Sequence, residues 1–119
     1  MAQEKGLVNE NLEIILPIHL TNGQIIECVL DTGFNGALLL PREFVEENKM
    51  EFAGREPVTM VENYQAEIDA VIGEFDWMDK SFFVRVLVSD FGECLIGTQM
   101  LVDSKLEVNY KNLTVKITK

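Results

Sequence analysis

The chain has 119 residues, a length that suggests one domain with a single core. Hydrophobic residues make up 47% of it, which is too many for a disordered segment. The 20 acidic residues against 10 basic ones give a formal charge of -10, which argues against nucleic acid and against an anionic membrane surface as partners.

The N-terminus and the cysteines bear on where the protein works. The first residues, Met-Ala-Gln-Glu-Lys-Gly, lack the basic flank and apolar core of a signal peptide. No apolar run reaches the roughly 18 residues that a membrane-spanning helix needs. Cys28 and Cys94 are the only cysteines, and their spacing fits neither a zinc site nor a disulfide framework. We therefore expect both cysteines to be reduced, in a cytoplasmic protein that does not contact a membrane.

In chain order, the sequence predicts many short strands and little helix. Residues 1–10 are expected to form a flexible or edge-strand N-terminus. Alternating apolar residues and runs of β-branched and aromatic side chains indicate the strands. These strands are expected over residues 12–20, 24–30, 38–40, 56–61, 65–72, 82–88, 94–96, 106–110 and 113–117. The pattern favours a compact all-β barrel or sandwich that forms one domain over residues 1–119.

Turn and cap residues separate these strands. Pro17 suggests that the first long strand lies at an edge or carries a bulge, and Asn22-Gly23 predicts the hairpin turn after it. Pro41 is expected to open a short helix. Residues 76–79 predict a second hairpin turn, and Thr98 is expected to cap one or two helical turns. Two short helices would then accompany the strands.

An acidic residue interrupts an apolar run at Asp31. Residues 28–41 read Cys-Val-Leu-Asp-Thr-Gly-Phe-Asn-Gly-Ala-Leu-Leu-Leu-Pro, so Asp31 directly follows an apolar strand segment. A buried carboxylate lowers the stability of the fold unless it is paired or hydrogen-bonded. Asp31 is therefore either part of an ordinary exposed turn or an interior carboxylate with partners that make it tolerable.

Asp-Thr-Gly at the end of an apolar strand also has a chemical interpretation. Two carboxylates held about 3 Å apart share one proton, so that one activates a water molecule while the other donates to the carbonyl under attack. This chemistry hydrolyses a peptide bond without a metal or a covalent intermediate. Thr32 suits a supporting role because its hydroxyl can bond to backbone. Gly33 allows a second backbone to approach and leaves its N–H free to reach a carboxylate oxygen.

Two motifs together resemble a known family. Val-Leu-Asp-Thr-Gly-Phe-Asn-Gly-Ala-Leu-Leu-Leu-Pro resembles the active-site segment of the retropepsin-like aspartic proteases, in particular their small bacterial single-domain members. Cys-Leu-Ile-Gly-Thr-Gln-Met-Leu, which contains Leu95, Ile96 and Gly97, resembles the family's structural motif of two apolar residues and a glycine. The resemblance extends over roughly residues 10–118. It implies an all-β acid-protease barrel with one or two short helices and one lobe per chain.

The resemblance also implies roles for individual residues. Asp31 corresponds to the catalytic aspartate, and Thr32 and Gly33 correspond to the residues that support it. The family's flap, a hairpin that closes over the substrate, corresponds to Met60, Val61, Glu62, Asn63 and Tyr64. No metal and no cofactor is implied.

One count determines the expected assembly. The chemistry needs two aspartates, whereas the chain has a single Asp-Thr-Gly and no Asp-Ser-Gly. A two-fold homodimer would therefore have to bring Asp31 and its copy together on the axis. The resemblance thus implies a homodimeric aspartic endopeptidase that cuts peptides or unfolded proteins. The negative charge predicts that neither nucleic acid nor a membrane is a partner. Its activity is expected to be highest on the acidic side of neutrality.

Two other functions stay open at this stage. The chain could be a non-catalytic dimerisation or peptide-binding module with the same fold. The lack of glycine in Glu62-Asn63-Tyr64 favours this alternative, and the intact Asp31-Thr32-Gly33 disfavours it. A glycosidase would need two carboxylates about 5 to 10 Å apart together with sugar-stacking aromatic residues, and a single Asp-Thr-Gly supplies neither.

Overall fold

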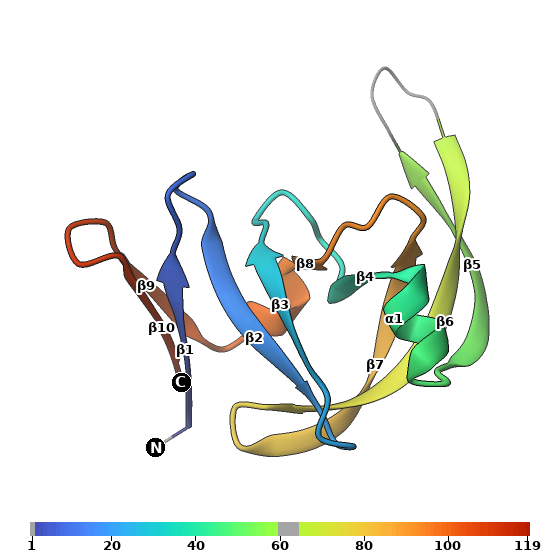
Figure 1. Ribbon diagram of the computed structural model, residues 1–119, viewed down its shortest axis with the longest axis horizontal. Helices are drawn as coiled ribbons and strands as arrows, with labels where there is room; N and C mark the ends of the chain where they lie inside the picture. The colour runs from blue at the N-terminus through green and yellow to red at the C-terminus, as the bar shows by residue number, and fades with distance from the viewer. Residues whose placement is uncertain (1, 60–64) are drawn as a thin grey trace.

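The computed structural model describes residues 2–59 and 65–119. Within these ranges the strands are β1 (Gln3–Val8), β2 (Ile14–Leu20), β3 (Ile25–Leu30), β4 (Leu38–Pro41), β5 (Glu51–Thr59), β6 (Gln65–Trp77), β7 (Lys80–Ser89), β8 (Leu95–Ile96), β9 (Lys105–Asn109) and β10 (Thr114–Thr118) (Figure 1). Helix α1 spans Arg42–Glu47, and a 3₁₀ helix, η2, spans Thr98–Leu101. No helix in the described ranges is long and apolar enough to cross a membrane. The predicted all-β class with short helices is confirmed.

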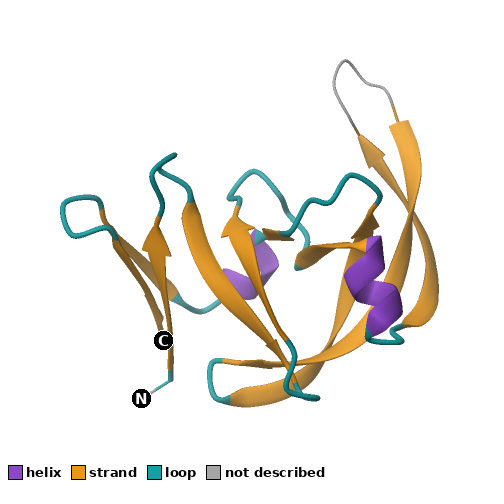
Figure 2. Ribbon diagram, in the orientation of Figure 1, coloured by secondary structure: helices purple, strands orange, loops and turns teal. Residues whose placement is uncertain are grey.

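The strands form one mixed sheet that closes on itself. Its order is β5-β6-β7-β4-β8-β3-β2-β1-β10-β9. An additional pairing of β6 with β2 places His19 opposite Asp76 and Leu20 opposite Phe75. The strands from β6 to β2 therefore form a closed barrel, with β5 on one flank and β1, β10 and β9 on the other (Figure 2). Closure removes the free edges of the barrel strands, since every one of them then has two partners.

Alternating apolar side chains fill the barrel. On β2, Leu16, Ile18 and Leu20 are at most 5% exposed, while the residues between them are partly exposed. The same period of two appears on β4 and β10. Fully buried side chains from the other barrel strands meet those of β2: Leu38, Leu40, Phe75, Val86 and Ile96. Truncating one of these leucines to alanine typically costs about 2–5 kcal/mol, so this core determines most of the stability.

Several strands are longer than the sequence predicts. β5 begins at Glu51 and not at residue 56, because a bulge between Phe52 and Arg55 lets the strand continue past Gly54. Gly54 has a φ of 105°, which a residue with a side chain rarely adopts. The predicted turn near residue 78 is confirmed, since β6 ends at Trp77 and β7 begins three residues later.

Three local predictions need correction or refinement. β1 lies between β2 and β10, so the N-terminal segment is not the flexible or edge strand that the sequence predicts. Its pairing with the distant C-terminal strand leaves no local signal in the sequence. Pro17 does lie at a local edge, because β2 pairs with β1 before it and with β6 after it. η2 has Gly97 and not Thr98 as its N-cap, because Thr98 is drawn into the helix, where its hydroxyl donates to the carbonyl of Phe34 at 3.4 Å.

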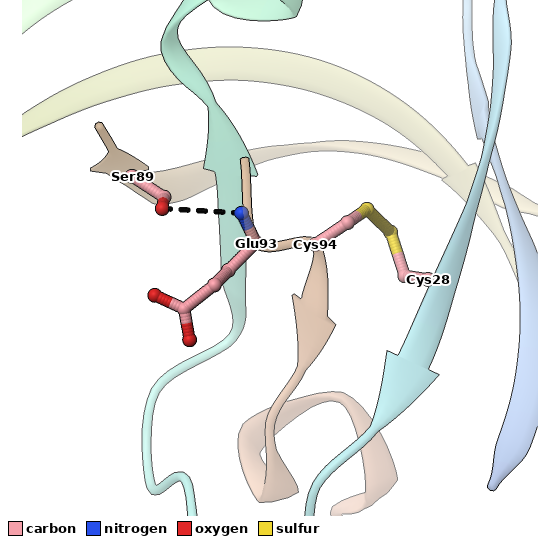
Figure 3. The surroundings of a disulfide bond; sticks show 4 residues. All are labelled: Cys28, Ser89, Glu93 and Cys94. Atoms are coloured by element: carbon pink, nitrogen blue, oxygen red, sulfur yellow. Dashed lines mark hydrogen bonds between the residues drawn. A yellow bond between two sulfur atoms is a disulfide. The ribbon is translucent and has the colours of Figure 1, made fainter. Parts of the chain in front are cut away.

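The prediction of two reduced cysteines is wrong. The structure joins Cys28 on β3 to Cys94, directly before β8, in a disulfide (Figure 3). Pairing of Val29 with Leu95 makes the two cysteines neighbours, and their Cα atoms are 4.8 Å apart, within the usual range for a disulfide. Disulfides are rare in the cytoplasm. The cysteines therefore no longer support the cytoplasmic location, which stays a prediction.

One carboxylate of the flanking sheet is partly buried. Glu4 on β1 accepts a hydrogen bond from the backbone N–H of Met78 at 2.8 Å. Burial raises the pKa of Glu4, and the hydrogen bond from Met78 offsets this only in part. The folded protein therefore holds the Glu4 proton more tightly than the unfolded chain does. The contribution of Glu4 to stability is fully present below the unfolded pKa and is lost as pH rises through the raised pKa.

We expect Glu4→Gln to abolish this pH dependence. The amide oxygen still accepts the hydrogen bond from Met78, but it carries no charge that burial penalises. The free energy of unfolding is measured with urea between about pH 4 and pH 7. The difference between the variant and the wild type should increase with pH, because only the wild type loses the contribution of Glu4. Glu10→Gln is the matched control, because Glu10 is exposed. A difference between Glu4→Gln and wild type that does not change with pH would contradict the interpretation.

Candidate active site

Asp31 lies where the chain crosses over one of its own strands. β8 is inserted between β3, to which it is parallel, and β4, to which it is antiparallel. The loop of residues 31–37 connects β3 to β4 and therefore passes over the end of β8 (Figure 1). Asp31 is the first residue of this loop.

Backbone hydrogen bonds fix the loop on the segment that follows β8. The N–H groups of residues 97, 98 and 99 donate to the carbonyl oxygens of Ala37, Phe34 and Gly36, at 2.8, 2.9 and 3.2 Å respectively. The N–H of Asp31 donates to the carbonyl of Ile96 at 2.9 Å. Because these bonds come from both ends of the loop, the backbone at Asp31 is held from β8 as well as from β3.

Gly97 is the tightest point of the crossing. A Cβ atom there would overlap the carbonyl oxygen of Gly36 and would lie 2.8 Å from the Phe34 ring. A Cβ atom on Gly36 would lie 2.7 Å from the same ring. Gly36 therefore leaves room for the Phe34 ring, and Gly97 leaves room for the backbone of Gly36 in direct contact, which a larger residue at position 97 permits only with a shift of the main chain.

The Asp31 carboxylate is oriented by its own turn. It is partly buried, and its Oδ1 accepts a hydrogen bond from the N–H of Gly33 at 2.9 Å. The N–H of Phe34 donates to the Asp31 carbonyl at 3.0 Å, which closes the turn. Thr32 and Gly33 are exposed. An oriented carboxylate that still reaches solvent can act as a general base on water if a second acidic group protonates the substrate.

The structure brings together some of the predicted site residues. Asp31, Thr32 and Gly33 lie next to the motif of Leu95, Ile96 and Gly97, of which Ile96 is fully buried in the core. The predicted flap residues lie outside the described ranges: Met60, Val61, Glu62, Asn63 and Tyr64. The described ends of β5 and β6 that flank them are on the same side of the molecule as the 31–37 loop (Figure 1).

Two cavities in the described parts of the chain lie away from Asp31. One of about 850 Å³ is lined by β9, β10 and Lys5, and one of about 420 Å³ lies between the β2–β3 turn and residues 48–51. Asp31 lines neither of them. Among residues 2–59 and 65–119, no group of three or more His, Cys, Asp or Glu side chains is placed to hold a metal ion.

Solved structures share this architecture. No family model matches the sequence, and no curated protein matches it significantly. The crystal structure of a retropepsin-like aspartic protease from Rickettsia conorii matches with a TM-score of 0.62 and 16% identity, over 97% of this chain and 89% of that chain. The foamy viral protease-reverse transcriptase in complex with an RNA/DNA hybrid matches with a TM-score of 0.58 and 17% identity, over 80% of this chain.

The chain has the retropepsin-like fold. The likeness to the first neighbour extends over nearly the whole chain, and the predicted fold class is confirmed. At such low identity the likeness concerns the fold and not the activity. The chain covers only 13% of the foamy viral protein, which is in complex with RNA/DNA. That nucleic acid is not a partner therefore stays a prediction based on charge.

Sequence reasoning missed an ion network beside the retropepsin-like barrel. Arg42 on α1 donates to Asp90 and, at 3.1 Å, to Asp69 on β6, which also accepts from Arg55 on β5 at 3.1 Å. Hydrogen bonds with Asp90 and then Asp69 raise the pKa of Arg42 above its usual range, and the bond from Arg42 lowers the pKa of Asp90. The network ties α1 to the β5–β6 pair and to the loop after β7. Its members are far apart in the sequence, so no local pattern reveals it.

Gly36 and the disulfide are two further features of this site that were missed. The sequence does show Gly36, because a second glycine follows Gly33 of Asp-Thr-Gly after Phe34 and Asn35. The cysteines also carried a signal: Cys28 precedes Asp31 by the same three residues by which Cys94 precedes Gly97. Equal offsets from two motifs that pair in the fold place the cysteines side by side.

We expect Gly97→Ala to destabilise the retropepsin-like fold, because its Cβ would overlap the backbone of Gly36. Overpacking of this kind costs about 1–3 kcal/mol, measured as the loss in free energy of unfolding in urea. Gly33→Ala is the matched control, because a Cβ there meets only Asp31 Oδ1, at 3.2 Å. It should cost clearly less. Equal losses in the two variants would show that the contact with Gly36 is not the reason for a glycine at position 97.

Proposed function

We propose that the protein is an aspartic endopeptidase that acts as a homodimer on peptides or unfolded proteins. The observation that carries this proposal is the placement of Asp31: a partly buried carboxylate in a retropepsin-like fold, with its backbone bonded to Ile96 and its Oδ1 bonded to Gly33. The alternative of an ordinary exposed turn does not account for the contact between two backbones that holds the Asp31 loop in place. Residues 1–119 form one lobe in this proposal, and two lobes make the enzyme.

The mechanism uses two copies of Asp31 that share one proton. One carboxylate, as the general base, takes a proton from a water molecule, which attacks the carbonyl carbon of the scissile peptide. The other, protonated, donates its proton to the carbonyl oxygen, and a tetrahedral intermediate forms. Proton transfer to the amide nitrogen then releases the two products. Gly33 orients one carboxylate oxygen throughout, and Thr32 supports the loop of the facing subunit.

The number of Asp-Thr-Gly motifs and the exposure of the loop support the dimer. The sequence holds a single Asp-Thr-Gly, and Asp31 lines neither of the two cavities described above. Thr32 and Gly33 are exposed, so a second copy can reach them. A cleft whose other wall belongs to a second subunit accounts for all three observations. In the complete site, residues 60–64 act as the flap over the substrate.

The first test replaces the proposed general base. Asp31→Asn keeps the size of the side chain and an acceptor for the Gly33 N–H, but it cannot take a proton from water. Cleavage of a denatured protein, followed by mass spectrometry, should fall by roughly 10³-fold or more. Asp103→Asn is the matched control, since Asp103 is an exposed residue outside the site, and it should cleave like the wild type. Undiminished cleavage by Asp31→Asn would refute the mechanism. A wild-type dimer that cleaves nothing would favour the binding module.

A second test asks whether both subunits contribute their aspartate. Wild-type and Asp31→Asn chains are unfolded together in equal amounts and refolded. If every active dimer needs two intact copies, about one quarter of the dimers are active, and the activity falls to about half of that expected for independent subunits. Refolding with Asp103→Asn in place of Asp31→Asn is the control and should leave full activity. A linear dependence on the wild-type fraction would mean that each subunit acts independently through its own Asp31, and about three quarters of full activity would mean that one Asp31 per dimer is enough.

The shared proton predicts an acidic activity profile. Because one carboxylate must keep its proton and the other must lose it, the rate should follow a bell-shaped curve whose maximum lies below neutral pH. The curve is measured as kcat/KM for a fluorogenic peptide across the pH range in which the protein stays folded, with circular dichroism as the check on folding. A rate that rises steadily through neutral pH would exclude a shared proton.

A further inference from the structure

The disulfide lies directly beside the loop of residues 31–37, which carries Asp31 and is the proposed catalytic loop. Cys28 is on β3, three residues before Asp31, and Cys94 precedes Gly97 by three residues. β3 and β8 are parallel, with Val29 opposite Leu95 and Leu30 opposite Ile96. The disulfide therefore joins the two strands at the end opposite to the crossing at Gly97.

β8 has few backbone attachments to its neighbouring strands. It is two residues long, and it pairs with β3 and with β4 only through those two residues. On the β3 side, the N–H of Val29 donates to the Cys94 carbonyl at 3.0 Å, and the N–H of Asp31 donates to the Ile96 carbonyl at 2.9 Å. Both bonds lie between the disulfide and the catalytic loop. The lengths of these two hydrogen bonds therefore depend on the distance between β3 and β8.

The chain before Cys94 gives β8 little support. Residues 90–93 form an exposed loop after β7. The buried hydroxyl of Ser89 accepts a hydrogen bond from the N–H of Phe91 at 3.1 Å. It also accepts one from the N–H of Glu93 at 3.3 Å (Figure 3). These bonds shape the loop, but they connect it to β7 and not to β3. The disulfide is thus the covalent link between β3 and this end of β8.

The two cysteines differ in exposure. Cys28 is 1% exposed, whereas Cys94 is partly exposed. A thiolate from solvent therefore attacks the sulfur of Cys94, forms a mixed disulfide there and releases Cys28 as a thiolate, which takes up a proton. A dithiol reductant completes the reaction: its second thiolate displaces Cys94 and closes the reductant's own disulfide. Two electrons pass to the protein, which ends with two thiols.

We infer that the Cys28–Cys94 disulfide positions Asp31 through β3 and β8, so that its reduction by a dithiol lowers the rate of the proposed reaction. Reduction removes the covalent link between β3 and β8. The hydrogen bond between Asp31 and Ile96 must then hold the two strands together without it. The cysteines are positioning residues and do not touch the substrate. This inference rests on the proposed function for its effect on rate, but its effect on the loop does not depend on activity.

The test compares the oxidised protein with the protein treated with dithiothreitol. We expect kcat for a fluorogenic peptide to fall by roughly tenfold, because small displacements of a catalytic group are costly, with little change in KM and with recovery on reoxidation. Cys28→Ala/Cys94→Ala should have the low rate with or without dithiothreitol. Alkylation of both thiols in untreated native protein, or equal rates for oxidised and reduced wild type, would overturn the inference.

Amide hydrogen exchange gives a readout that does not require activity. On reduction, the N–H groups of Asp31 and Gly97 should exchange at least about tenfold faster. The N–H of Val8, which donates to the Leu113 carbonyl at 3.0 Å in the flanking sheet, should not change. Unchanged exchange at Asp31, or an equal loss of protection at Val8, would overturn the positioning role. If the oxidised wild type cleaves no peptide, the proposed function fails, and the exchange result still decides the inference.

Discussion

The contact between two backbones at Gly97 and Gly36 is the constraint on which the site depends. It exists because β8 is inserted between β3 and β4, so that the loop joining these two strands must pass over the chain that leaves β8. With no side chain at either glycine, three successive N–H groups after β8 can donate to carbonyls of the loop. Asp31 is the first residue of that loop, and its position follows directly from the crossing.

The core of the barrel anchors the chain on both sides of this crossing. Ile96, one residue before Gly97, is fully buried among the core side chains of the barrel. On the other side of Gly97, the carbonyl of Met100 in η2 accepts a hydrogen bond from the buried Trp77 Nε1 at 3.1 Å. Gly97 is therefore fixed between two anchors in the core. Large apolar side chains, which confer most of the stability, thereby set the geometry of a polar loop at the rim.

What the sequence predicts well is local, and what it misses is long-range. Asn22-Gly23 and Pro41 act on the residues next to them, so the turn and the start of α1 were predicted correctly. Asp31 and Gly97 each lie in a short motif, and their role in catalysis stays a prediction. The Cys28–Cys94 disulfide, the interior place of β1 and the bonds of Arg42 with Asp69 and Asp90 all join residues far apart in the chain. Periodicity and turn signals carry no information on such pairings, because they describe only neighbouring residues.

Charge adds a condition to the proposed assembly. Each subunit has a formal charge of -10, so two subunits repel one another, and two facing Asp31 carboxylates add to this repulsion at close range. A proton shared by the two carboxylates removes the second contribution. Association and proton uptake are then linked, since the dimer holds a proton that the separate chains do not share. In such a dimer, acidic pH favours both the assembly and the protonation state that the chemistry requires, and one carboxylate pair accounts for both effects.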